Sequence, residues 1–134
     1  MRYQRAETPL KLDGLDAARG FFAGCLADSD LAQESLWVAH LDDQAHCLHL
    51  SRHQGDPDST GLPIRAILSD AVAHGSSGIV LAHNHPSGDP RPSDDDCRAT
   101  RRLASAAEAI DCTIVDHLVF GGADCTSFRQ IGLL

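Results

Sequence analysis

One short apolar run, Gly78–Ala82 (GIVLA), constrains the fold of this chain more than any other feature. An uninterrupted run of this length, bounded by polar residues, is typical of a strand that is buried on both faces of a sheet. The segment that follows it, His83–Asp96, consists almost entirely of polar and turn-forming residues. The run therefore predicts a central strand whose end carries a polar segment to the edge of the sheet.

The segments around this run alternate between helical and strand-like patterns. Leu62–His74 has apolar residues at helical spacing, with Pro63 in its first turn and Gly75 just past its end. The other expected elements are helices over Leu15–Leu26 (capped by Asp13 or Asp16) and Cys97–Ala109, strands over Leu36–Leu41, Cys47–Leu50 and Cys112–Phe120, a loop over His53–Gly61 and a short C-terminal tail. This alternation predicts a single α/β domain over residues 1–134 with a mixed sheet.

Charge argues against one large class of partners. The chain has 134 residues, a formal net charge of −8 and a single lysine, Lys11. A protein that grips a nucleic-acid backbone needs clustered lysines and arginines to neutralise phosphates. General binding to nucleic acid is therefore disfavoured.

The cysteines and the N-terminus indicate a compartment. The cysteines number five and are widely spaced, which suggests neither a disulfide framework nor a C-x-x-C metal knuckle. Free thiols fit a reducing compartment. Met1–Leu10 lacks the apolar core of a secretory signal, and no stretch has the roughly 18 apolar residues of a membrane span. We expect a cytoplasmic protein without a membrane partner.

The segment His83–Asp96 (HNHPSGDPRPSDDD) carries most of the chemistry that the sequence offers. His83 and His85 are two residues apart, so on a strand their side chains point to the same side. Open α/β sheets bind ligands at the carboxyl ends of their strands. A loop stiffened by prolines then brings three aspartates, Asp94–Asp96, to the start of a helix. Two histidines and one carboxylate are a ligand set of catalytic zinc sites, where the metal activates a water molecule.

The same residues also match the start of a helix. Ser93 and Asp96 fit a capping box, and Asp94 and Asp95 would complement the helix dipole. Capping and metal binding are compatible roles. The spacing does not decide which of the three aspartates would bind a metal ion.

The other histidines have no such context. His117 follows Asp116 within an expected strand. We expect a buried ring that is hydrogen-bonded to its surroundings, or one that orients a metal ligand. The remaining histidines are expected to face solvent or to lie in loops: His40, His46, His49, His53 and His74.

The polar segment closely resembles the motif of the JAMM (MPN+/JAB) metalloproteases, H-x-H followed by seven residues and then S-x-x-D. The longer string is similar to the RadC branch of that family in bacteria. The resemblance runs from about Glu34 to the C-terminus. The positions that carry it are His83, His85, Pro86–Pro92, Ser93 and Asp96, with Asp116–Val119 (DHLV) and the tail Ser127–Leu134.

This resemblance implies a fold and a site. The fold is a curved mixed sheet flanked by helices. The site is one Zn²⁺ ion held by His83, His85 and Asp96. The family also has a glutamate on its first strand, matched here by Glu34, which takes a proton from the zinc-bound water and later gives it to the leaving amine. Ser93 matches the serine that helps to stabilise the oxyanion.

The chain departs from the RadC pattern at its N-terminus. RadC proteins usually carry a helix-hairpin-helix region there, and the residues before Glu34 are too few for that module together with the first helix. We therefore expect the region to be absent from this sequence. We therefore do not expect a DNA role borrowed from the family name to transfer to this chain.

The sequence leads to one hypothesis and one alternative. The hypothesis is a zinc-dependent metallohydrolase, a metallopeptidase or isopeptidase that cleaves an amide bond in a peptide or protein substrate. The alternative is a non-catalytic metal-binding interaction module, in a context associated with DNA repair. Neither the natural substrate nor the oligomeric state can be read from the sequence.

Overall fold

The structure of the protein is a computed structural model that describes residues 10–54 and 61–134. Within these residues, three helices and five strands alternate along the chain. Their bounds are α1 Leu15–Ala27, β1 Ser35–Leu41, β2 Cys47–Gln54, α2 Ile64–His74, β3 Gly78–Asn84, α3 Asp94–Glu108, β4 Thr113–Gly121 and β5 Asp124–Ser127.

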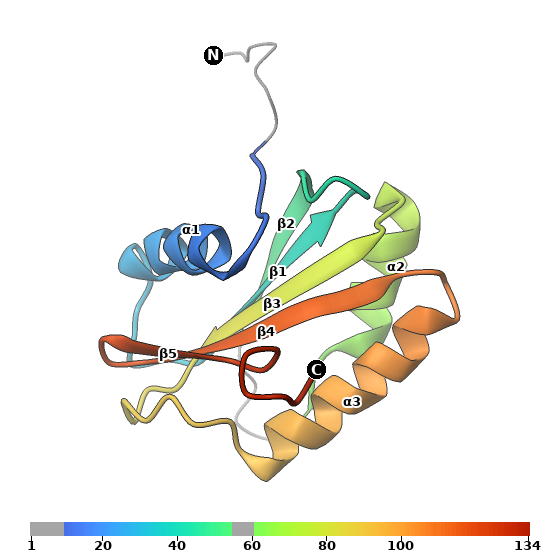
Figure 1. Cartoon of the computed structure of the whole chain (residues 1–134). Helices are drawn as coiled ribbons and strands as arrows, with labels where there is room; N and C mark the ends of the chain where they lie inside the picture. The colour runs from blue at the N-terminus through green and yellow to red at the C-terminus, as the bar shows by residue number, and fades with distance from the viewer. Residues whose placement is uncertain (1–9, 55–60) are drawn as a thin grey trace.

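The strands form one sheet in the order β2-β1-β3-β4-β5. β3 and β4 are parallel, and the other neighbouring strands are antiparallel, so the sheet is mixed. Helix α1 covers one face, while α2 and α3 cover the other (Figure 1). The predicted class, a single α/β domain with a mixed sheet flanked by helices, is confirmed.

Strand β3 is central and fully buried, as its apolar run predicts. Ile79 and Leu81 pack under α2 and α3, and Val80 and Ala82 pack under α1. Because both faces are covered, every position of the strand is removed from water. The same burial continues to His83 and Asn84, so the end of β3 carries polar groups into the interior.

Several expectations about the elements were wrong. The tail contains a further strand, β5, which pairs with β4 at the edge of the sheet. Strand β2 continues through His53 and Gln54, which were expected in a loop; the rest of that loop except Gly61 lies outside the described residues. Helix α1 has Gly14 at its N-cap and no side-chain cap, so neither Asp13 nor Asp16 caps it.

One expectation about the histidines was also wrong. His40 is completely buried in β1, because α2 covers that face of the sheet. His46, His49 and His53 are partly buried, and His74 is exposed at the end of α2. The described helices include none long and apolar enough to cross a membrane. All the cysteines lie in the described residues and are free thiols, as expected.

Candidate metal centre

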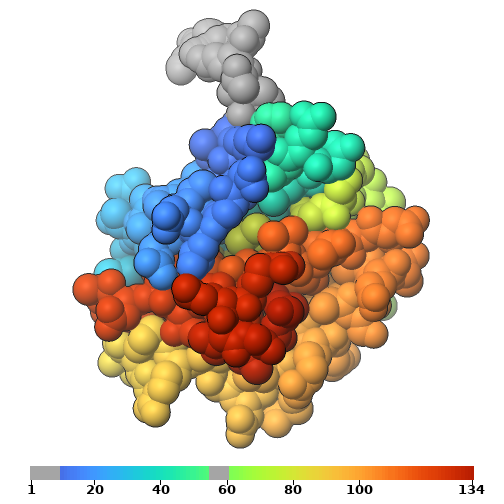
Figure 2. All heavy atoms as spheres, viewed as in Figure 1, coloured from blue at the N-terminus to red at the C-terminus, as the bar shows by residue number. Residues whose placement is uncertain are grey.

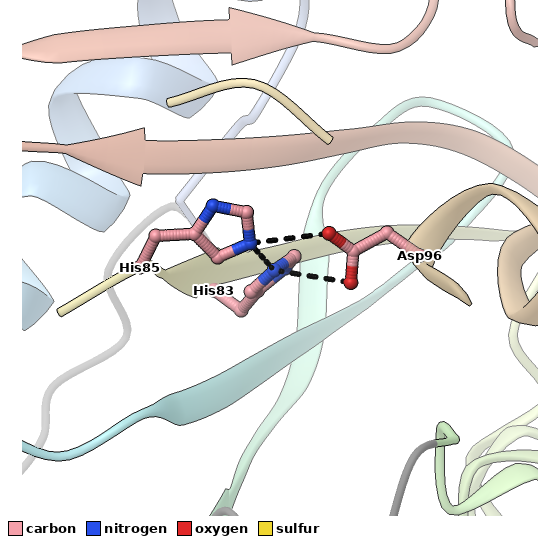
Figure 3. A group of neighbouring side chains, drawn as sticks. All are labelled: His83, His85 and Asp96. Atoms are coloured by element: carbon pink, nitrogen blue, oxygen red, sulfur yellow. Dashed lines mark hydrogen bonds and ion pairs between the residues drawn. The ribbon is translucent and has the colours of Figure 1, made fainter. Parts of the chain in front are cut away.

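Two imidazoles and one carboxylate converge at the carboxyl end of β3 (Figure 3). His83 Nε2 lies 3.0 Å from His85 Nε2. Asp96 reaches the same point from the first turn of α3, with Oδ1 3.5 Å from His83 Nε2 and Oδ2 3.1 Å from His85 Nε2. The His83 side chain is only 3% exposed, whereas those of His85 and Asp96 are 17% and 18% exposed. The group is therefore closed on the His83 side and open to solvent on the other.

In both His83 and His85, the ring nitrogen Nδ1, which points away from the shared centre, is held by a hydrogen bond. His85 Nδ1 lies 2.8 Å from the Asp89 carbonyl oxygen, which can only accept, so Nδ1 donates. His83 Nδ1 lies 2.8 Å from Nε2 of His117. Complete burial holds the pKa of His117 well below its usual value, so this ring is neutral and has one acceptor nitrogen.

His117 extends the chain of hydrogen bonds into α3. Its Nδ1 lies 2.7 Å from Thr100 Oγ1. When His83 donates from Nδ1 to His117 Nε2, the neutral His117 ring carries its proton on Nδ1 and donates it to Thr100. Both His83 and His85 are then left with an Nε2 lone pair that points at the shared centre. His117 is thus the buried, hydrogen-bonded ring that the sequence predicted.

The donor set fits a divalent metal ion. Two imidazole lone pairs and a carboxylate are all hydrogen-bond acceptors, so they cannot approach to 3.0–3.5 Å unless protons or a cation lie among them. Four ligands about 2.0–2.1 Å from a tetrahedral zinc ion lie about 3.3 Å apart, which matches these separations. His83, His85 and Asp96 could therefore hold a metal ion.

Asp96 also begins helix α3. Ser93 is the N-cap: its Oγ accepts from the Asp96 backbone N–H at 3.0 Å, and Asp96 Oδ2 accepts from the Ser93 N–H at 2.8 Å. The predicted capping box is confirmed, and it explains why α3 begins before Cys97. Of the three aspartates only Asp96 faces the histidines; Asp94 and Asp95 are exposed, and Asp95 pairs with Arg98.

Electrostatics at the centre favour the ionised carboxylate. Burial alone would raise the pKa of Asp96, but its contacts with His83 and with Ser93 outweigh the effect of burial, so the pKa lies well below the usual range. A carboxylate that stays ionised is the form that binds a metal ion.

The end of β4 supports the loop that holds His85. The His85 N–H donates to the Phe120 carbonyl at 2.7 Å. A Cβ placed on Gly121 would lie 2.5 Å from the Pro90 nitrogen and 2.6 Å from the Asp89 carbonyl carbon. Only glycine therefore lets the backbone of this loop pack against β4, with the Asp89 carbonyl within reach of His85.

Asn84, between the two histidines in sequence, holds the segment that precedes β1. Its Oδ1 accepts from the Ser35 N–H at 2.8 Å, and its Nδ2 donates to the Gln33 carbonyl at 3.0 Å. These bonds fix the backbone on both sides of Glu34. Glu34 lies just before β1, with its side chain exposed and outside the convergent group. Leu36 pairs with His83 in the sheet, so these two side chains share a face, and Glu34 precedes Leu36 by two residues.

The sequence model of a family described as the RadC-like JAB domain matches residues 15–133. The chain belongs to this family. A UPF0758 protein of Porphyromonas gingivalis is 38% identical to this RadC-like JAB domain over 108 residues, which are 79% of the chain and 48% of that protein. UPF0758 protein YfjY of Escherichia coli is 33% identical over 129 residues, which are 96% of the chain and 79% of that protein.

These relatives show the family and leave the activity open. The domain spans about half the length of the Porphyromonas gingivalis protein, and a UPF0758 protein of Symbiobacterium thermophilum is 47% identical over only 70 residues. None of these names states a reaction, a substrate or a partner.

Sequence reasoning missed two parts of this RadC-like centre. The contacts of Asn84 were not foreseen, although an amide between two candidate metal ligands at a strand end is a signal for a structural role. Thr100 was also missed, because it looks like an ordinary helical residue. It lies one turn after Asp96 on α3, which brings its hydroxyl to the same side of the helix.

Proposed function

We propose that this RadC-like JAB domain is a zinc-dependent metallohydrolase that cleaves an amide bond in a peptide or protein substrate, as a peptidase or an isopeptidase. The observation that carries the proposal is the convergence of acceptor atoms from His83, His85 and Asp96 with one open side. A zinc ion held there would polarise a carbonyl and make hydroxide available at neutral pH.

The residues around this centre divide the remaining work. The hydrogen bonds to Asp89 and His117 hold the two imidazoles in the tautomer that presents Nε2. Glu34 is the carboxylate that would accept the proton of the attacking water and return it to the leaving amine. It is carried on a backbone that Asn84 fixes on both sides, which limits its movement relative to His83.

Ser93 carries a hydroxyl group that can act as a hydrogen-bond donor. Its Oγ accepts a hydrogen bond in the cap of α3, and the hydroxyl also carries one proton that it can donate. Because Ser93 is exposed and precedes Asp96 by less than one turn, its hydroxyl would donate to the oxyanion of a tetrahedral intermediate.

The alternative is a metal-binding module that docks to a partner without turnover. The open side of the centre favours a hydrolase, because a metal that only holds the fold together is closed off by four protein ligands. Free thiols support a reducing compartment, and we propose the cytoplasm as the place where the protein works.

The test separates metal binding from turnover. Zinc-loaded protein is incubated with a library of quenched fluorescent peptides and with isopeptide-linked peptides. We expect cleavage that Glu34→Gln abolishes while zinc is retained, that Asp96→Ala abolishes with loss of zinc, and that the control Glu108→Gln, on the exposed face of α3, leaves unchanged.

Three results would contradict parts of the proposal. Full turnover in Glu34→Gln removes that residue from the mechanism. Turnover in Asp96→Ala without zinc refutes a metallohydrolase. Zinc binding without cleavage of any substrate would favour the alternative, a non-catalytic interaction module.

A further inference from the structure

A second group of histidines lies toward the other end of the sheet from the candidate metal centre. It consists of His40 on β1, His49 on β2, and Asp70 and His74 on α2; we call it the His40 group. The ring centroids of His49 and His74 are 4.0 Å apart, and that of His40 is 5.7 Å from the first and 6.3 Å from the second. His49 Nε2 lies 4.0 Å from Asp70 Oδ2.

His40 is the buried member, and one of its two ring nitrogens lacks a hydrogen-bond partner among the described residues. Its Nδ1 lies 2.9 Å from Ser76 Oγ, which can accept the proton, while Nε2 has no hydrogen-bond partner in the described part of the chain. The residue is 0% exposed. Burial lowers the pKa of His40 to about 4, although Asp70 opposes this, so the ring is neutral near pH 7. A neutral imidazole with a free lone pair is the form that binds a metal ion.

The four side chains come in two pairs with spacings suited to chelation. His40 and His49 are directly opposite each other in the β1–β2 ladder, where Cβ atoms are about 4.5–5.5 Å apart. Asp70 and His74 are four residues apart on α2, which places them on one face, as in the paired ligands of helical zinc motifs. Asp70 and His74 of α2 therefore lie beside His40 and His49 of the two strands.

We infer that the His40 group binds a second divalent metal ion, Zn²⁺, which imidazole ligands suit. Three imidazoles and one carboxylate complete a four-coordinate shell without a place for substrate, which makes this a structural site. The ion would join the edge strand β2 to the C-terminal end of α2. The inference does not depend on the proposed hydrolase activity.

The exposed members can turn to close the site. The rings of His49 and His74 are stacked, with 11° between their planes, so at least one must rotate before both can direct nitrogens at one ion. His74 is exposed, and the side chains of His49 and Asp70 are 33% and 36% exposed, so the rotation would take place on the solvent side of the group. His40 is held by Ser76 and supplies the fixed point.

The test counts zinc ions bound by the 134-residue chain. Wild type and variants are dialysed to equilibrium against Zn²⁺, and metal per chain is measured by plasma mass spectrometry. We expect His49→Ala/His74→Ala to bind about one zinc fewer than wild type. The control His46→Ala/His53→Ala also removes two imidazoles, both from outside the group, and is expected to lose no zinc.

Asp96→Ala separates this site from the candidate metal centre. Zinc is expected to raise the melting temperature of Asp96→Ala, and adding His49→Ala/His74→Ala to that variant should abolish the rise. If the candidate metal centre does not bind zinc, Asp96→Ala will bind as much zinc per chain as wild type, and that result leaves this inference standing. The inference is overturned if His49→Ala/His74→Ala binds as much zinc as wild type, or if the control loses as much.

Discussion

The position of His117 makes a sharp prediction, because this ring contacts a candidate metal ligand and is itself 0% exposed. His117→Leu removes the acceptor that holds His83 Nδ1 at 2.8 Å and the donor that reaches Thr100 at 2.7 Å. His83 then loses the bond that selects its metal-binding tautomer.

The magnitude follows from the role of such outer partners. Removing the group that orients a metal-binding histidine typically costs about 10–100-fold in metal affinity, or roughly 1.4–2.8 kcal/mol. Because the His83 donor is buried, we expect a loss near the upper end, about 100-fold. His117→Gln can place an amide oxygen near the position of Nε2 and accept from His83, so we expect it to retain affinity within about tenfold.

The assay is a zinc titration in competition with a chromophoric chelator, run on wild type, His117→Leu, His117→Gln and Thr100→Val. Thr100→Val leaves the bond between His117 and His83 in place and should weaken zinc binding less than His117→Leu. A urea denaturation of each metal-free variant shows whether the fold is retained. The reasoning is refuted if folded His117→Leu binds zinc as tightly as wild type, or if His117→Gln is as weak as His117→Leu.

Two further predictions concern the buried histidine of β1 and the loop beside β4. Burial lowers the pKa of His40 to about 4 in the folded chain, against about 6.5 in the unfolded chain. The unfolded chain therefore takes up the proton first as the pH falls. The free energy of unfolding is expected to decrease between about pH 6.5 and pH 4, by up to about 3 kcal/mol. Urea denaturation in chelator at pH 7 and 5 should show a smaller drop for His40→Leu; an equal drop would contradict it. Gly121→Ala should push the loop that contains Asp89 and Pro90 away from β4 and weaken zinc binding about tenfold in the chelator titration. The control Gly20→Ala, whose Cβ would meet open space, should bind zinc like wild type. Equal zinc affinities of the two variants would count against the close packing at Gly121.

The local patterns of the sequence were sufficient for the central part of the fold. The run Gly78–Ala82 has no alternation, and the strand it predicts is buried on both faces. Strand β5 escaped prediction because Asp124–Ser127 is short and half-polar, and only its pairing with β4 makes it a strand. His40 was assigned to solvent because nothing in its neighbourhood along the chain reveals that α2 will cover it.

The candidate site divides in the same way. His83, His85 and Asp96 lie close together in sequence, and a strand end, a stiff loop and a helix cap suffice to bring them together. The contacts around them span longer separations in sequence: His117, from the neighbouring parallel strand, contacts His83, and Asn84 reaches across to the segment before β1. Such contacts depend on strand order, which local spacing does not encode.

The central claim is that His83, His85 and Asp96 hold zinc, and the most direct test is the metal content of the purified chain. Plasma mass spectrometry is applied to wild type and to His83→Ala/His85→Ala after dialysis against Zn²⁺. We expect wild type to carry about one zinc ion per chain more than the variant. Equal zinc in the two proteins, with both folded, would contradict the account and leave His83 and His85 without a metal to bind.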